Sequence, residues 1–200
     1  MAQVIDFHTS ASAIFNQGDE AAFIYLLVDG VVRTFHTSPD GERQIVAFHW
    51  PGDLFGLAEH GRHVTSAETI TSSQIYRFPC QKLERFLLKN PKIEDGFLIK
   101  AIHDLRSAQR QLIIMGRLAI FRRLAVFLLD CSAHEHYFDK AKRLLTLPMS
   151  RYDIADYLGT SAETVTRALS KLTADDAVRR VSARALKLDL DKLRTLADFD

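Results

Sequence analysis

Cysteine is scarce in this sequence. Only Cys80 and Cys131 occur in 200 residues, and they lie far apart. Two cysteines cannot supply the four thiolates of a structural zinc or iron–sulfur site within one chain. Their isolation also favours reduced thiols over a disulfide framework. We therefore expect a protein of a reducing compartment.

Long apolar runs and a secretion signal are also missing. No stretch approaches the roughly 18 apolar residues that are needed to span a bilayer. The first ten residues, MAQVIDFHTS, contain no basic segment followed by an apolar one. No nucleophile elbow, phosphate-binding loop, metal triad or paired-carboxylate site is recognisable. We expect a cytoplasmic protein without a membrane partner, and not an enzyme.

Charge is nearly balanced in total but unevenly distributed. The net charge is +1. Residues 1–96 contain 8 Lys and Arg against 12 Asp and Glu, whereas residues 140–184 contain 9 against 5. An acidic front and a basic back indicate a C-terminal part that binds a polyanion.

The first ninety or so residues are rich in strand signals. Residues 22–38, AFIYLLVDGVVRTFHTS, contain two β-branched and aromatic runs on either side of Asp29-Gly30, a pair typical of a hairpin turn. Further turn and strand segments follow at 38–43, 43–50 and 67–79. Short strands separated by turns at intervals of about 8–12 residues predict a sandwich or barrel-like β domain.

From Gln81 the apolar residues recur at helical spacing. A short helix is expected to end near Asn90-Pro91. Beyond it, a seam at alternating spacings of four and three is typical of helix–helix contact. This seam consists of Leu98, Ile102, Leu105, Gln109 and Leu112. The helix either packs on its own domain or pairs in parallel with its copy in a homodimer.

The capping and turn residues of the C-terminal third predict a unit of two short helices. Helices are expected over 150–158 and about 161–172, after an apolar helix over 117–134 and before a β-hairpin over 177–190. Ser150 and Asp153 stand at capping-box spacing, and Gly159 is placed to end the first short helix. Helix, glycine turn and helix together predict a helix-turn-helix.

The second short helix has a polar outer face. It presents Glu163, Thr166, Arg167 and Ser170. In a DNA major groove, Arg bonds the O6 and N7 atoms of guanine, and Glu accepts from the cytosine amino group. A purely structural alternative makes Glu163 a capping-box partner of Thr160 and makes Arg167 its ion-pair partner. Candidate contacts to phosphates are Arg151, Ser161, Ser170, Lys171, Arg179 and Arg180.

Residues 147–172, LPMSRYDIADYLGTSAETVTRALSKL, resemble the DNA-binding domain of the Crp/Fnr family of transcription regulators. The segment YLLVDGVVRTF…GERQIVAFHWPGDLFGL is similar to that family's sensor domain, and the Fnr and FixK-like branch is nearest. The resemblance covers nearly the whole chain and implies an α+β fold of three parts. These are a β-roll over 1–96 (a cyclic-nucleotide-binding-like jelly roll), a dimerisation helix over 97–116 and a winged helix-turn-helix over 117–200.

The resemblance also implies a function. Glu163, Thr166 and Arg167 match the family's E-x-x-T/S-R base-reading core. A homodimer is expected to bind double-stranded DNA at an inverted repeat of the TTGAT…ATCAA type, with RNA polymerase as a partner. An activator in oxygen, redox or nitrogen-related control is expected. The alternative is a signalling module that binds a cyclic nucleotide or another small ligand, with DNA binding secondary or lost.

The segment that binds cyclic AMP in some family members is altered here. Those members carry a Gly-Glu pair and then an Arg-Ser pair, which hold the ribose and the cyclic phosphate. In this sequence Gly56 keeps the glycine, Leu57 replaces the glutamate, and Thr65-Ser66 replace Arg-Ser. The charge for the phosphate is missing unless Arg62 turns inward. We expect a vestigial pocket that does not bind cyclic AMP in this mode.

Other cofactors are judged by the remaining ligands. No cysteine precedes Cys80, so the N-terminal cluster that holds an iron–sulfur centre in the Fnr branch is absent. No metal site is predicted, but haem stays open because two histidine pairs have ligand-like spacing. The pairs are His60 with His63 and His134 with His136. The alternative is that these histidines are solvent-facing polar residues in connecting segments. Cys80 and Cys131 are either redox switches or small buried apolar residues.

Overall fold

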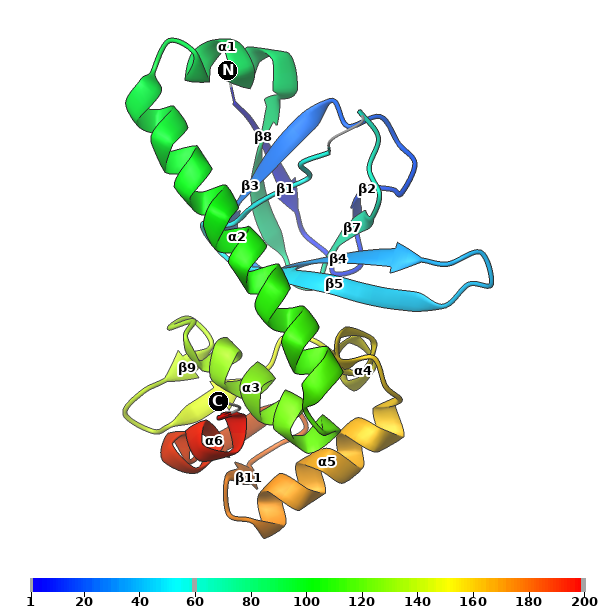
Figure 1. Cartoon of the computed structure of the whole chain (residues 1–200), viewed down its shortest axis with the longest axis vertical. Coiled ribbons are helices and arrows are strands. Elements are labelled where there is room, and N and C mark those ends of the chain that lie inside the picture. Colours follow the sequence, from blue (N-terminus) through cyan, green and yellow to red (C-terminus); the bar gives the residue numbers. More distant parts are fainter. Residues whose placement is uncertain (1, 59–60, 199–200) are drawn as a thin grey trace. The chain divides into compact units, whose positions relative to one another are not determined.

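The structure is a computed structural model that describes residues 2–58 and 61–198. The chain divides into two compact units, Met1–Gln109 and Arg110–Asp200. The division falls inside one long helix, α2 (Pro91–Arg117), which contains the predicted dimerisation helix 97–116. Each unit is described by itself below (Figure 1).

The first unit is built on two antiparallel sheets, with strand orders β1-β8-β3-β6 and β2-β7-β4-β5. The strands are β1 (Gln3–Phe7), β2 (Ala13–Phe15), β3 (Phe23–Asp29), β4 (Val32–Thr37), β5 (Arg43–His49), β6 (Leu54–Phe55), β7 (Ser66–Thr69) and β8 (Ser73–Pro79). Apolar residues from both sheets form one core between them, because alternate side chains of each strand point inward. The predicted β domain is confirmed.

The predicted hairpin at Asp29-Gly30 is wrong. The chain does turn there, but β3 pairs with β8 and β6, whereas β4 pairs with β5 and β7. The residues after the turn bond instead to the β7–β8 connection. Val31 N donates to Thr71 Oγ1 over 2.9 Å, and Ile70 N donates to Val31 O over 2.7 Å. The turn therefore carries the chain from one sheet to the other.

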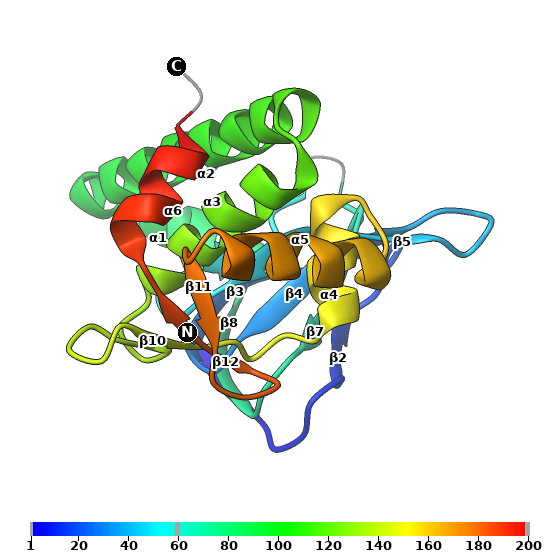
Figure 2. The ribbon, with the colours of Figure 1, turned by 90° about the horizontal axis from the view of Figure 1, so that it is seen from below.

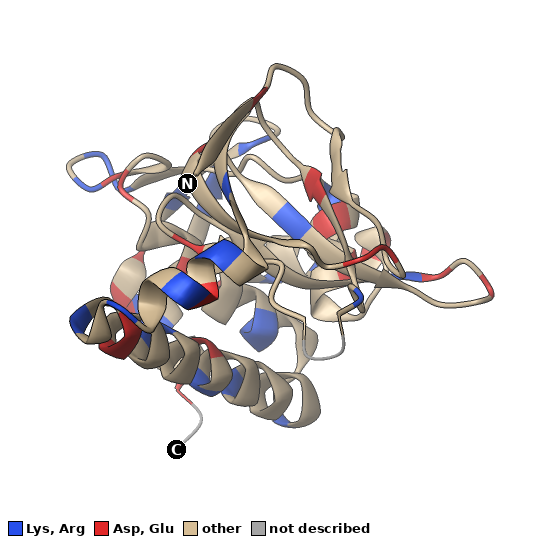
Figure 3. Cartoon of the chain, turned by 90° about the horizontal axis from the view of Figure 1, so that it is seen from above, with Lys and Arg blue, Asp and Glu red and all other residues tan. Residues whose placement is uncertain are grey.

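The predicted turn at 38–43 does close a hairpin, formed by β4 and β5. Ser38 and Glu42 face each other across it, with Ser38 N donating to Glu42 O over 2.9 Å. Its tip carries acidic residues (Figure 3).

Two helices follow the strands. α1 (Cys80–Leu87) ends before Asn90, and α2 begins at Pro91. Proline is well tolerated at the first helical position, where its missing N–H has no partner to lose. The predicted break between two helices at this point is confirmed. No helix in the described part of the chain is both long and apolar enough to cross a membrane.

The second unit combines helices with one small sheet of order β11-β12-β10-β9. Its elements are α3 (Ile120–Ser132), β9 (Phe138–Asp139), β10 (Leu144–Thr146), α4 (Arg151–Leu158), α5 (Ala162–Ala174), β11 (Val178–Arg180), β12 (Ala185–Leu188) and α6 (Leu190–Ala197). α3 lies in the interior, with Leu124 and Leu128 almost fully buried. The predicted hairpin over 177–190 is confirmed as β11 and β12, which pair antiparallel.

Candidate nucleic-acid interface

Helix α4 and the turn after it are set by local sequence. Ser150 is the N-cap: its Oγ accepts from Asp153 N over 3.1 Å, and Ser150 N donates to Asp153 Oδ2 over 2.9 Å. The predicted capping box is therefore confirmed. Gly159 ends the helix at φ 64° and ψ 48°, a left-handed conformation that glycine adopts without a Cβ penalty. The chain can then turn at once into α5, and Figure 2 shows the two helices meeting at an angle.

The start of α5 differs from the purely structural alternative, in which Thr160 and Glu163 form a capping box. Its N-cap is Ser161, whose Oγ accepts from Thr164 N over 3.2 Å. Glu163 is therefore not the capping-box partner of Thr160. The other half of that alternative is present: Arg167 Nη1 lies 3.6 Å from Glu163 Oε1. The two side chains are 69% and 78% exposed, so this ion pair contributes only about 0–1 kcal/mol and leaves both groups accessible.

The two faces of α5 are sharply separated. Val165 and Leu172 are fully buried, whereas Thr166 and Ser170 are exposed together with the Glu163–Arg167 pair. Thr166 Oγ1 donates to Ala162 O over 2.9 Å. Its hydroxyl hydrogen is thus used within the helix, and it presents lone pairs and a methyl group to solvent. Outward, α5 offers a fork of donors, a carboxylate and a methyl group, which suit base edges in a major groove.

Basic side chains surround this face, and the structure brings some of the predicted ones together. Burial lowers the pKa of the half-buried Arg151, and the positive charge of Arg180 lowers that pKa further. A bound anion would relieve this repulsion between like charges. Arg179 and Arg180 are both exposed, but neighbouring residues of a strand point to opposite faces. Arg180 is thus the strand residue that faces Arg151, and Arg179 is expected to point to the other side of β11.

The remaining phosphate candidates lie on α5. Lys171 is exposed, and its Nζ sits 4.7 Å from the centre of the Phe121 ring. This contact holds the ammonium near the end of the helix. Ser161 is exposed, although its Oγ is 2.9 Å from Thr164 Oγ1, and Ser170 Oγ donates to Thr166 O over 3.1 Å.

Sequence reasoning missed Tyr152. Its side chain is 72% exposed in the first turn of α4, next to Arg151. The signal was available, because a residue two positions after the N-cap Ser150 lies at a helix N-terminus, where backbone N–H groups favour phosphate. An exposed tyrosine at that point can donate its hydroxyl to a phosphate oxygen.

The segment that matches the cyclic-nucleotide site lies in the first unit. Gly56 has φ +84°, and a Cβ there would stand 2.7 Å from a ring carbon of Tyr25, so close packing alone requires glycine. Leu57 is exposed, Thr65 is half-buried, and Ser66 Oγ accepts from Gln17 N over 2.9 Å.

Arg62, the one cation of that segment, is directed elsewhere. Its Nη1 donates to Gly18 O over 2.7 Å. The guanidinium is therefore engaged by a backbone carbonyl and does not supply the missing positive charge.

Aromatic rings fill the space between the two sheets. The Phe15 ring is stacked on His63, with 3.7 Å between centroids, and lies 5.4 Å from the Tyr25 ring. Phe55 continues the series, with its centroid 5.3 Å from Tyr25 and 4.9 Å from His49. The protein's own side chains thus occupy the interior that faces the altered segment.

The histidine pairs can be judged only for their described members. His60 lies outside the described residues, and its predicted partner His63 is buried against Phe15. Burial lowers the pKa of His63. The ring of His136 packs edge-on against Tyr137. Within 2–58 and 61–198, no cluster of three or more His, Cys, Asp or Glu side chains is arranged to hold a metal ion.

Both thiols are shielded. Cys131 is buried, and that burial raises its pKa well above the usual value. Cys80 is half-buried, its pKa is also raised by burial, and its Sγ lies 3.4 Å from Ala21 O. Protonated thiols are poor nucleophiles, so both cysteines fit the role of small apolar residues better than that of redox switches.

A β-roll followed by a long helix and a winged helix-turn-helix defines a class of DNA-binding proteins that carry a ligand-sensor type of domain. Comparison with known families agrees part by part. Residues 8–90 match the cyclic nucleotide-binding domain, and residues 122–196 match the Crp-like helix-turn-helix domain.

Individual relatives match over most of the chain. The nitrogen fixation regulation protein FixK of Bradyrhizobium diazoefficiens is 33% identical over 94% of this chain and 80% of its own length. The transcriptional activatory protein AadR of Rhodopseudomonas palustris is 31% identical, over 92% of this chain and 77% of its own. The structure of FixK2 from Bradyrhizobium japonicum superposes with a TM-score of 0.89 at 31% identity, covering 100% of this chain and 99% of that one. The chain belongs to the Crp/Fnr family of transcription regulators, and the resemblance and fold expected from its sequence are confirmed.

Proposed function

We propose that this regulator binds, as a homodimer, an inverted repeat of the TTGAT…ATCAA type, with Glu163, Thr166 and Arg167 reading the bases. The observation that carries the proposal is the outer face of α5. The side chains of Arg167 and Glu163 on this face are 69% and 78% exposed, although the opposite face of the same helix is fully buried. Among the described residues, the contacts of these side chains stay within α5 itself, and a major groove would supply partners for their outward-facing donors and acceptors.

The ion pair prepares Arg167 for its role. Glu163 holds the guanidinium on the outer face at 3.6 Å, so less side-chain entropy is lost when the fork meets a guanine. The same carboxylate can accept from a neighbouring cytosine amino group. Arg151, Ser161, Ser170, Lys171, Arg179 and Arg180 are proposed to contact phosphates and set the position of the helix.

The homodimer rests on the exposed seam of α2. Leu98, Leu105 and Leu112 are 60%, 59% and 74% exposed, and Ile102 is 46% exposed. Large apolar side chains in heptad positions with this exposure gain free energy when a second helix covers them. Gln109 lies in the same seam and would fix the register of a parallel pair. A two-fold dimer then matches a two-fold DNA site.

The sensor domain is proposed not to bind cyclic AMP in the family's mode. The ribose carboxylate is replaced by Leu57, Arg62 is engaged with Gly18 O, and aromatic rings fill the interior. Titration calorimetry with cyclic AMP tests this. Saturable binding in the micromolar range would contradict the proposal.

The biological setting is proposed from the relatives. One is named a nitrogen fixation regulation protein and another a transcriptional activatory protein. We infer that this protein activates genes in oxygen, redox or nitrogen-related control in the cytoplasm, through contact with RNA polymerase. Transcription by purified polymerase from a promoter with and without the inverted repeat tests activation, since a repressor would lower transcript levels.

DNA binding itself is tested with two labelled duplexes. One carries TTGAT and ATCAA half-sites about one helical turn apart, centre to centre, and the other has the same composition in shuffled order. Fluorescence anisotropy at about 150 mM salt is expected to show at least ~1,000-fold tighter binding to the repeat. Equal affinity for both duplexes would contradict base reading and leave only an electrostatic interaction.

A further inference from the structure

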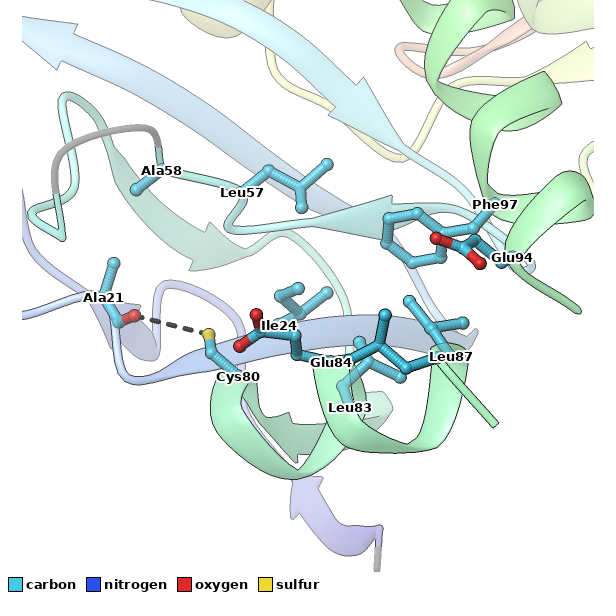
Figure 4. A pocket seen from close by; sticks show the side chains of 11 residues that line it. Ala21, Ile24, Leu57, Ala58, Cys80, Leu83, Glu84, Leu87, Glu94 and Phe97 are labelled. Carbon is cyan, nitrogen blue, oxygen red and sulfur yellow. Dashed lines mark hydrogen bonds between the residues drawn. The ribbon is translucent and has the colours of Figure 1, made fainter. Parts of the chain in front are cut away.

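A second candidate site lies on the outside of the first unit. A cavity of about 420 Å³ opens between the N-terminal end of β3, helix α1 and the first turns of α2. This volume falls within the range of about 300–1,000 Å³ that holds small organic ligands. All of its lining residues belong to one compact unit (Figure 4).

The wall of the cavity is mainly apolar. Ile24 from β3, Leu83 and Leu87 from α1, and Phe97 from α2 line it. Cys80 contributes a thiol whose hydrogen points to Ala21 O, 3.4 Å away (Figure 4). This wall suits an aliphatic or aromatic body.

Charge at the cavity has one sign. Glu84 from α1 and Glu94 from the first turn of α2 are among the lining residues (Figure 4), and both are exposed. None of the described residues that line the cavity is Lys or Arg. Neither carboxylate forms an ion pair within the described part of the chain. Two unneutralised carboxylates beside an apolar wall complement a cation with an apolar body.

Leu57 links this cavity to the altered interior segment. It occupies the position of the glutamate that meets the ribose in cyclic-AMP-binding relatives, and here it is 54% exposed and lines the outer cavity. The neighbouring Gly56 packs on Tyr25 and is not part of the lining. The substitution that removes a polar group from the interior site therefore adds an apolar wall to the outer one.

We propose that this outer cavity binds a small organic amine whose protonated nitrogen is attracted by the negative charge of Glu84 and Glu94 and whose apolar body lies on Leu57, Leu83 and Phe97. The ligand touches α1 and α2 together. Phe97 immediately precedes Leu98, the first residue of the exposed seam. Ligand binding is therefore expected to change the pairing of α2 with a second copy. This effect on pairing rests on the proposed homodimer, whereas the binding of the amine itself does not depend on it.

The test uses three probes with one indole body and different charge: tryptamine (cationic), indole-3-ethanol (neutral) and indole-3-acetate (anionic). Titration calorimetry on the full chain is expected to rank them in that order. Glu84→Gln and Glu94→Gln should each weaken tryptamine about three- to tenfold, as expected for partly exposed charge pairs, and should leave indole-3-ethanol unchanged. Asp95→Asn is the matched control, because Asp95 is exposed on the same turn and does not line the cavity.

A bulky side chain should close the site. Ala58→Trp at the cavity wall is expected to abolish binding of all three probes, while the thermal unfolding midpoint shows that the variant folds. Saturable tryptamine binding that survives Ala58→Trp, or equal affinity for tryptamine and indole-3-acetate, would overturn the proposal. So would the absence of binding of any probe up to about millimolar concentration.

The effect on the dimer is measured separately, by sedimentation with and without tryptamine. A shift of the monomer–dimer equilibrium that is lost in Glu94→Gln supports the coupling. Binding without any shift removes the coupling but not the site. A chain that is monomeric throughout contradicts the proposed homodimer rather than the amine site.

Discussion

Replacing Arg167 with alanine separates a role in DNA reading from a role in folding. The side chain is 69% exposed, and within the described part of the chain it forms an ion pair with Glu163 at 3.6 Å. An exposed i, i+4 pair stabilises a helix by about 0.3–0.5 kcal/mol, and alanine regains part of this through its higher helix propensity. Arg167→Ala should therefore change the free energy of unfolding by less than about 0.5 kcal/mol.

The expected loss in DNA affinity is much larger. A bidentate arginine–guanine contact is worth about 1–3 kcal/mol, and a homodimer on an inverted repeat makes it twice. The predicted loss is about 2–6 kcal/mol per dimer, which corresponds to roughly 30-fold to 10⁴-fold weaker binding. Nonspecific binding to the shuffled duplex should fall only slightly, because two charges of the whole basic surface are removed per dimer.

The assay is fluorescence anisotropy on both duplexes over a range of salt concentrations, beside chemical unfolding of the same preparation. Lys171→Ala is the matched control for charge on the same helix. It should weaken both duplexes alike and lower the salt slope. An equal loss on both duplexes for Arg167→Ala would refute base reading by this side chain. A loss of stability above about 2 kcal/mol would instead give Arg167 a structural role.

Four further outcomes are expected. Leu105→Glu places a charge in the exposed seam of each protomer and should yield monomers in sedimentation experiments. A dimer that persists would show that the interface lies elsewhere. Burial lowers the pKa of His49 to about 4, so the unfolded chain binds an extra proton between about pH 4 and 6.5. The contribution of neutral His49 to the free energy of unfolding is complete above that window and is lost as the pH falls through it. Within the window, the free energy of unfolding should change with pH by on the order of 1 kcal/mol per pH unit, and unfolding curves of His49→Gln should show a smaller change. Ser150→Ala removes the N-cap of α4 and should cost about 1 kcal/mol. Leu172→Ala opens a cavity under α5 and should cost about 2–5 kcal/mol, measured by denaturant unfolding with no change in m-value.

The helix-turn-helix was predictable because its signals are local. Ser150 and Asp153 are three residues apart, and Gly159 follows the last apolar position of the helix it ends. Such contacts depend on backbone groups within one turn, so the sequence alone predicts them. The capping of α5 shows the limit of this reasoning. Two adjacent residues, Thr160 and Ser161, both suit an N-cap, and only the dihedral angles decide for Ser161.

The hairpin at Asp29-Gly30 failed for a non-local reason. The dipeptide and its flanking runs fit a two-stranded hairpin, and the turn is real. Which strands pair, however, depends on residues far along the chain. β3 is already flanked by β8 and β6, and Val31 is held by Thr71, forty residues later. A local turn signal predicts a change of direction but not the sheet into which the chain turns.

The candidate amine cavity and the filled interior show why a sensor's specificity is harder to predict than its fold. Phe15 stacks on His63, 48 residues away, and Leu57 and Phe97, which line one cavity, are 40 residues apart in the chain. The sequence shows that Leu57 removes a polar ligand group from the interior. It does not show that the same side chain is exposed and lines a cavity together with Glu84 and Glu94. The loss of one ligand class and the proposed gain of another can thus involve a single position, because Leu57 both removes a polar group from the interior segment and lines the outer cavity.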